Sequence, residues 1–132
     1  MEIQFYSAER EVTGSCHIVR VLGKTILLDS GLFRGRRADV QQKNAGLPVP
    51  VEEIDAVVLS HAHVDHAGRL PFPVRKGFDG AIHATPATRD LCEVMLADSA
   101  HIQEQDAAFL ARRSKTHAEP LYAQRDVVQN ST

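Results

Sequence analysis

A dense cluster of metal-ligand side chains directly follows a short apolar run, and this pairing restricts the fold more than any other feature. The run spans residues 56–60, and the cluster reads His61-Ala62-His63-Val64-Asp65-His66. A run of this kind is typical of a strand buried on both faces. Because side chains alternate faces along a strand, we expect His61 and His63 to converge on one cation at its end. Asp65 and His66 would address a second cation after the chain turns.

The residue types in the cluster indicate zinc, which binds imidazole and carboxylate groups at about 2.0–2.2 Å. A single histidine or a His-x-His pair is more often a surface group or a satisfied core group. Four candidate ligands within six residues favour a metal site. A catalytic zinc ion takes three protein ligands and a water, so two donors per ion leave each ion incomplete. Four other histidines remain as candidates, although local hydrogen bonding is the preferred interpretation for each of them: His17, His83, His101 and His117.

Alternating strand and helix patterns along the chain predict an α/β domain. Strands are expected at residues 3–6, 15–22, 25–29, 56–60 and 80–84, with a tight turn at Gly23-Lys24 and a long loop over 30–50. A short helix is expected near residues 67–76, interrupted by two prolines, and a longer one from an N-cap at Thr85 to about residue 113. Another helix is expected to start after Pro120. Helical spacing predicts the apolar face of the long helix: Leu91, Val94, Met95, Ile102, Phe109 and Leu110.

Length and composition are those of one ordinary globular domain. The chain has 132 residues, 43% of them hydrophobic, and a formal net charge of −2, which excludes a strongly basic nucleic-acid-binding module. No apolar run approaches the roughly 20 residues that span a bilayer, and the N-terminus does not resemble a signal peptide. Two cysteines form no disulfide framework and fit a reducing compartment. We therefore expect a cytoplasmic protein without a membrane partner.

The string HAHVDH resembles the HxHxDH signature of the metallo-beta-lactamase superfamily. The resemblance implies a site for two Zn²⁺ ions, with His61 and His63 on one ion and Asp65 and His66 on the other. Asp29 matches an earlier aspartate of the superfamily, which implies that it orients the metal ligands through hydrogen bonds. On the alternative interpretation, Asp29 only begins a turn with the Ser30-Gly31 pair that follows it.

The flanking strings resemble the β-CASP branch of the superfamily, a group of RNA nucleases. They are residues 10–17, 28–35, 59–71, 84–88 and 98–104. The resemblance implies that residues 1–132 are a partial metallo-beta-lactamase domain, the N-terminal half of an αββα sandwich. The C-terminal half, the remaining metal ligands and the β-CASP insert of the family have no counterpart in these 132 residues.

The function implied by this resemblance is zinc-dependent hydrolysis of RNA phosphodiester bonds, in RNA processing or decay. Asp65 would hold a metal, orient the attacking water and accept its proton. The acid that protonates the leaving group is expected in the family's downstream region. An arginine trio in the long loop either contacts the RNA backbone or, on the preferred interpretation, is solvated: Arg34, Arg36 and Arg37.

Two other functions remain open from the sequence. The chain could be another metallo-beta-lactamase hydrolase, acting on thioesters, lactams or lactones. Alternatively, it could be a non-catalytic truncated fragment that needs a partner chain. Half of a sandwich exposes an apolar face, so we expect self-association or a complementing chain.

Overall fold

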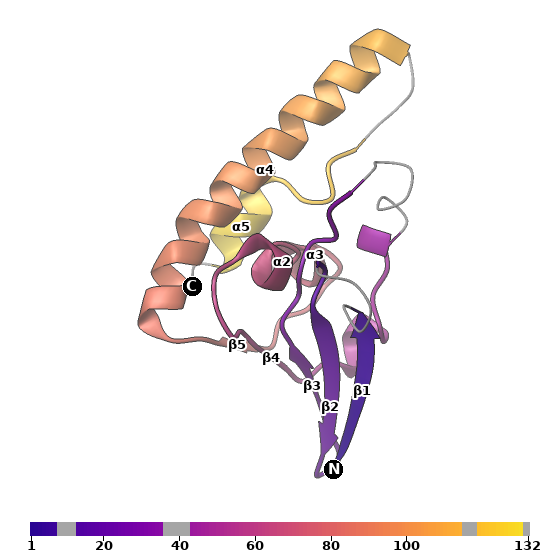
Figure 1. Cartoon of the computed structure of the whole chain (residues 1–132), viewed down its shortest axis with the longest axis vertical. Helices are drawn as coiled ribbons and strands as arrows, with labels where there is room; N and C mark the ends of the chain where they lie inside the picture. Colours follow the sequence, from indigo (N-terminus) through magenta and orange to yellow (C-terminus); the bar gives the residue numbers. More distant parts are fainter. Residues whose placement is uncertain (8–12, 36–42, 115–118, 131–132) are drawn as a thin grey trace.

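A five-stranded mixed sheet is the framework of the chain (Figure 1). The computed structural model describes residues 1–7, 13–35, 43–114 and 119–130. The strands run in the order β1-β2-β3-β4-β5, antiparallel from β1 to β3 and parallel from β3 to β5. The α/β class is confirmed. The strand bounds are β1 Glu2–Ser7, β2 Cys16–Val21, β3 Lys24–Leu28, β4 Ala56–Val58 and β5 Ala81–His83.

The β2–β3 hairpin is confirmed, but its turn lies one residue earlier than the sequence predicted. Leu22 and Gly23 form the turn with φ angles of 52° and 74°, while Lys24 pairs with Val21 inside the ladder. Two-residue hairpin turns of this type need positive φ at both central positions, because their twist then matches that of the strands. A leucine in the first position gave no signal of this conformation.

Within the described residues, five helical segments connect or follow the strands. The helix predicted near residues 67–76 is confirmed only in part: two short helices occupy this region, the first begins before Ala67, and the second contains both prolines. Pro71 starts the second of them, because proline at a first helical position loses no hydrogen bond. None of the described helices is both long enough and apolar enough to cross a membrane. The bounds are η1 Val51–Glu53, α2 Val64–Ala67, α3 Pro71–Arg75, α4 Pro86–Ser114 and α5 Gln124–Asn130.

The core lies between one face of the sheet, which we call the inner face, and the helices. Ile18, Leu27 and Val57 are paired neighbours on three adjacent strands, and each is 0% exposed. Residues of the helices and of the turns around them complete this core: Ala67, Leu70, Phe78, Cys92, Leu96, Ala100, Tyr122 and Val127.

Helix α4 begins as the sequence predicted, but its buried face is a different one. Thr85 caps it, because the Thr85 Oγ1 accepts the Thr88 N–H at 3.3 Å. The face that contacts the core carries Cys92, Leu96 and Ala100, at four-residue spacing. Most of the predicted face is exposed: Leu91 62%, Val94 72%, Ile102 49% and Phe109 51%. Figure 1 shows α4 extending away from the sheet, with α5 packed beside it.

The opposite face of the sheet, the outer face, is also apolar but only partly covered. Strand pairing places two rows of residues on it. Strand β5 was predicted to be buried, and this is wrong, because Ala81 and His83 are exposed. The rows are Ile3-Val19-Ile26-Ala56-Ala81 and Phe5-His17-Leu28-Val58-His83.

The segment after β3 is bound closely to the turn that carries the histidine cluster. Gly31 lies against the backbone of Asp65 and Ser15, where a Cβ atom would overlap both. This approach therefore requires glycine. The contact is made by backbone hydrogen bonds of 2.8–3.0 Å: Ser30 N to His66 O, Leu32 N to Val64 O, Ser15 N to Asp65 O, Arg69 N to Ser30 O and Gly31 N to Ser15 O.

Arg69 reinforces the same contact from inside the protein. Its side chain is 1% exposed, and its Nε donates to the Gly31 carbonyl at 2.9 Å. Its Nη1 lies 2.8–3.1 Å from three carbonyls of the segment over residues 43–46. Burial lowers the pKa of this guanidinium, yet hydrogen bonds to carbonyls offset the cost of removing the charge from water.

Tyr122 connects the α5 region to the end of α2. Its hydroxyl lies 2.6 Å from the Gly68 carbonyl and 2.8 Å from Ser99 Oγ. A phenol has one proton and a carbonyl can only accept, so Tyr122 donates to Gly68 and receives a hydrogen bond from Ser99. Burial raises the pKa of Tyr122 to about 12. The neutral phenol is therefore part of the folded structure.

We predict that Gly31→Ala destabilises the chain by about 1–3 kcal/mol or more, because the backbone must separate to admit the methyl group. Chemical denaturation measures the change. Gly23→Asn is the matched control: nothing lies within 4 Å of a Cβ there, and asparagine tolerates positive φ. Equal stability of the Gly31→Ala variant and the wild type would show that the close approach is not required.

Tyr122→Phe should lower the free energy of unfolding by about 1–3 kcal/mol at neutral pH, since the Gly68 carbonyl loses its donor. Below pH 10 tyrosine is protonated in both states, so its contribution is complete. The contribution is lost as the pH rises through about 12, because the unfolded state releases the proton first. Denaturation between pH 9 and 12 should show a shallower decline for Tyr122→Phe than for the control Tyr6→Phe.

Candidate metal centre

Three imidazole rings of the predicted cluster lie together at the sheet edge where β4 ends. The ring centroids of His61 and His63 are 4.7 Å apart, and those of His61 and His66 are 4.1 Å apart. The predicted cause of this convergence, alternation of side chains along a strand, is wrong. Strand β4 ends at Val58, so His61 and His63 lie in a connecting segment, and His63 is the N-cap residue of α2. The turn into α2 gathers the rings, not strand alternation.

The buried Asp29 side chain holds this group of rings in place. Asp29 directly follows β3, has a φ angle of 67°, and is 4% exposed. Its Oδ2 lies 2.8 Å from His66 Nδ1 and 2.8 Å from Ser60 Oγ, and its Oδ1 accepts the Ser60 N–H at 2.7 Å. A left-handed backbone is unfavourable for most residues but is adopted by aspartate more readily than by β-branched residues. The carboxylate therefore contacts both ends of the cluster.

Asp65 and His66 lie at the start of α2 with their polar atoms facing each other. His66 Nε2 and Asp65 Oδ2 are 3.6 Å apart. Two ligands of one tetrahedral zinc ion are separated by about 3.4 Å when each bond is about 2.1 Å. The pair is therefore spaced for a shared cation, and the hydrogen bond of His66 Nδ1 to Asp29 leaves Nε2 available for one.

The donor types and this spacing fit zinc, but the number of converging donors is small. Within residues 1–7, 13–35, 43–114 and 119–130, no three His, Cys, Asp or Glu side chains form a group ready to hold a metal ion. A catalytic zinc site takes three protein ligands. The described cluster thus provides part of a ligand set.

The other histidines that the structure describes do not join the cluster. His17 lies on the outer face of β2, 5.2 Å from Phe5 in an edge contact, and its buried Nδ1 has no hydrogen-bond partner among the described residues. His83 ends β5 and His101 lies midway along α4, both exposed. Arg34 is exposed, and its N–H donates to Thr13 Oγ1 at 3.2 Å. His117, Arg36 and Arg37 lie outside the described residues.

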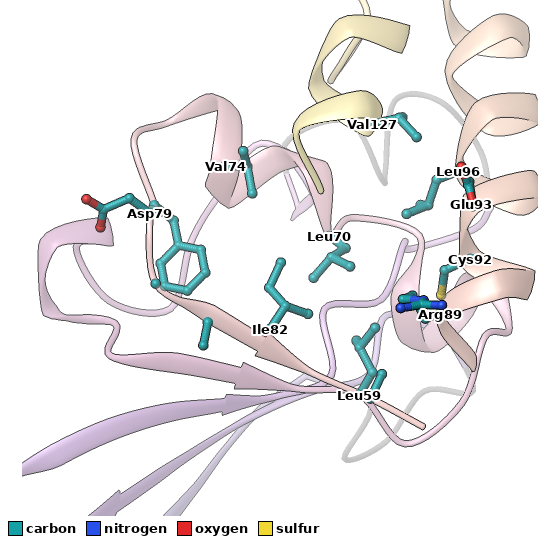
Figure 2. A pocket seen from close by; sticks show the side chains of 14 residues that line it. Leu59, Leu70, Val74, Asp79, Ile82, Arg89, Cys92, Glu93, Leu96 and Val127 are labelled. Carbon is teal, nitrogen blue, oxygen red and sulfur yellow. The ribbon is translucent and has the colours of Figure 1, made fainter. Parts of the chain in front are cut away.

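Two cavities of the described chain lie away from the cluster. One of about 740 Å³ is lined by residues of α4, β5 and α3, including Cys92, Ile82 and Leu96 (Figure 2). Another, of about 510 Å³, is lined by parts of α3 and α4. Neither is lined by the histidines. Within the cluster His63 is exposed, whereas His61, Asp65 and His66 are half-buried.

The two thiols are not candidates for a nucleophile. Both cysteines are buried, and they form no disulfide. Burial raises the pKa of Cys16 to about 11, and burial also raises the pKa of Cys92. A nucleophilic cysteine needs the opposite change, since the thiolate is the reactive form.

Sequence reasoning missed one residue of this site, Ser60. Its hydroxyl bridges Asp29 and His61, at 2.8 and 2.9 Å. The available signal was its place directly before the first histidine, which favours the contact with His61 but gives no indication of the contact with Asp29.

The matches to known proteins agree with this geometry. A family model described as the metallo-beta-lactamase superfamily matches residues 10–116. Ribonuclease TTHA0252 of Thermus thermophilus is 41% identical over 105 residues, which are 80% of this chain and 24% of that protein. Transcription termination factor FttA of Methanocaldococcus jannaschii is 30% identical, over 87% of this chain and 18% of that protein. Endoribonuclease YSH1 of Candida glabrata is 29% identical, over 98% of this chain and 16% of that protein.

The chain thus spans about a quarter or less of the length of these curated relatives. The similarity to ribonucleases confirms the predicted resemblance to the β-CASP branch, over part of the length of its members. The predicted partial fold is confirmed as well, since the family model covers most of the five-stranded sheet and α4. The chain belongs to the metallo-beta-lactamase superfamily.

Proposed function

We propose that this chain carries the first metal-binding segment of a zinc-dependent hydrolase that cleaves RNA phosphodiester bonds. The observation that carries the proposal is the group of three adjacent imidazoles braced by the buried Asp29 carboxylate. Buried hydrogen bonds that orient histidines are the usual support of metal ligands. The ribonuclease relatives favour RNA over the thioesters, lactams or lactones of other superfamily hydrolases.

The proposed ligands are His61 and His63 for one ion and Asp65 and His66 for the other. When bound, two zinc ions lower the pKa of water and offset negative charge on phosphoryl oxygens. Asp65 is the carboxylate beside His66, at 3.6 Å, and is partly exposed. It is thus placed to orient a water molecule and to accept a proton from it. Asp29 is buried and takes no part beyond orienting its neighbours.

The small number of converging donors supports a second proposal for the 132-residue chain by itself. Two donors per ion give weaker binding than the three of a catalytic site. We infer that residues 1–132 bind zinc weakly and cleave RNA only together with further ligands, from the same polypeptide or from a partner. Buried thiols that form no disulfide agree with a reducing compartment such as the cytoplasm.

His63→Ala should weaken zinc binding by at least about tenfold, because it removes a proposed ligand at little cost to folding, the side chain being exposed. Calorimetric titration with Zn²⁺ measures the affinity. His101→Ala is the matched control, an equally exposed histidine on α4. In a ribonuclease relative that contains the complete fold, alanine at the histidine matching His63 should abolish RNA cleavage.

The substrate class is tested in the same relative. RNA should be cleaved in the presence of zinc, whereas a chromogenic thioester and a lactam should not be. Undiminished RNA cleavage after loss of the histidine would contradict the assignment of catalysis to this cluster. Zinc affinity equal in the His63→Ala and His101→Ala variants would contradict the ligand assignment separately.

We also propose that the outer face of the sheet packs against another apolar surface. Ile3 and Phe5 are 52% and 62% exposed, and apolar side chains continue across the neighbouring strands. Contiguous apolar surface of this kind marks an interface. For the chain alone, we infer that the same face of a second copy supplies this surface.

The chain should therefore self-associate with increasing concentration, and the double variant Ile3→Thr, Phe5→Thr should shift it toward monomer because these side chains lose apolar area. Multi-angle light scattering measures the mass. Val94→Gln is the control, since Val94 is 72% exposed but lies on α4. A wild-type chain that stays monomeric at every concentration would refute this interface.

A further inference from the structure

Ser60 joins Asp29 to the histidine cluster through one hydroxyl group. Its Oγ lies 2.8 Å from Asp29 Oδ2 and 2.9 Å from His61 Nδ1. Its main-chain N–H donates to Asp29 Oδ1 at 2.7 Å, which holds the serine in position against the carboxylate. Because Asp29 is 4% exposed, little water competes for the two hydrogen bonds that it accepts from Ser60, whereas the hydrogen bond between Ser60 and His61 is exposed.

The positions of the protons follow from what each group can donate. An ionised carboxylate only accepts hydrogen bonds, so the single Ser60 hydroxyl proton points toward Asp29. The opposite orientation would leave two oxygen lone pairs facing each other at 2.8 Å. The hydroxyl oxygen is then an acceptor for His61, whose Nδ1 must carry the proton. The lone pair of a neutral His61 ring is consequently on Nε2.

The same reasoning applies to His66, which contacts Asp29 directly. Its Nδ1 lies 2.8 Å from Asp29 Oδ2, so Nδ1 carries the proton and Nε2 carries the lone pair. For His63, no hydrogen bond within the described part of the chain holds either ring nitrogen. One buried carboxylate therefore sets the tautomers of two histidines and leaves the third unconstrained.

We propose that Ser60 is a positioning residue. Because its hydroxyl donates to Asp29, the hydroxyl oxygen accepts a hydrogen bond from His61 Nδ1, and His61 Nε2 is thereby presented to a cation. This inference rests on the proposed zinc function for its purpose, but the tautomer itself is a property of the metal-free chain. The ring nitrogen that binds a metal is set by the hydrogen bond of the other nitrogen. Ser60 supplies that hydrogen bond for His61.

Long-range ¹H–¹⁵N NMR of the metal-free, histidine-labelled chain tests the assignment directly. The spectra are recorded at a pH at which each ring gives the signals of a neutral imidazole, and they then show which ring nitrogen is protonated. In the wild type, His61 and His66 should both be protonated on Nδ1. Ser60→Ala should change the tautomer of His61 alone, with His66 as the internal control, and Ser60→Thr should restore it by restoring the hydroxyl.

Zinc titration of the same variants gives the functional readout. Ser60→Ala should weaken zinc binding by about 10- to 100-fold, the usual effect of removing a group that orients a ligand, and Ser60→Thr should recover it. A wild-type His61 protonated on Nε2, or a Ser60→Ala variant with an unchanged His61 tautomer, would overturn the proposal. The wild-type spectrum decides the matter even if Ser60→Ala does not fold. Absence of RNA cleavage by the ribonuclease relative with the complete fold would contradict the proposed function and leave this result unaffected.

Discussion

The buried Asp29 carboxylate is the constraint on which the candidate site depends. It follows β3 with a left-handed backbone and accepts hydrogen bonds from Ser60 and His66, groups that lie 31 and 37 residues further along the chain. A buried charge is tolerated only when hydrogen bonds replace its hydration. Burial of Asp29 therefore depends on hydrogen bonds from the histidine turn, and the position of that turn depends on Asp29. The coupling explains why residues 30–32 are bound so closely to residues 64–66.

The two faces of the sheet have different tasks. The inner face and the helices form a core in which Ile18, Leu27 and Val57 are fully buried. The outer face is apolar yet only partly covered, which agrees with a layer of a larger sandwich. Because β3 and β4 lie side by side and are parallel, their carboxyl ends bring Asp29 and the histidines to the same edge. The parallel pairing of β3 and β4 therefore places the site at the edge of the sheet where these two strands end.

The parts of the structure that could be predicted from the sequence are those encoded by adjacent residues. Four potential ligands within six residues specify a cluster whatever the chain does around them. The Thr85-Pro86 start of α4 and the β2–β3 hairpin are likewise local, because a cap and a two-residue turn involve only a few neighbouring backbone groups. The role of Asp29 as an orienting residue came from family resemblance, and its hydrogen bonds agree with that role.

Tertiary structure decided which surfaces are buried and which atoms are free to bind a cation. Leu91 and Val94 have the spacing of a buried face, yet α4 turns Cys92 and Leu96 inward, because the position of the sheet and of Tyr122 selects the face. No local pattern shows that Ser60 lies between Asp29 and His61, since that contact needs two strands to pair. The sequence by itself determined the types and the order of the candidate ligands. Only long-range packing determined their orientation, because a side chain's direction depends on neighbours that are distant in the chain.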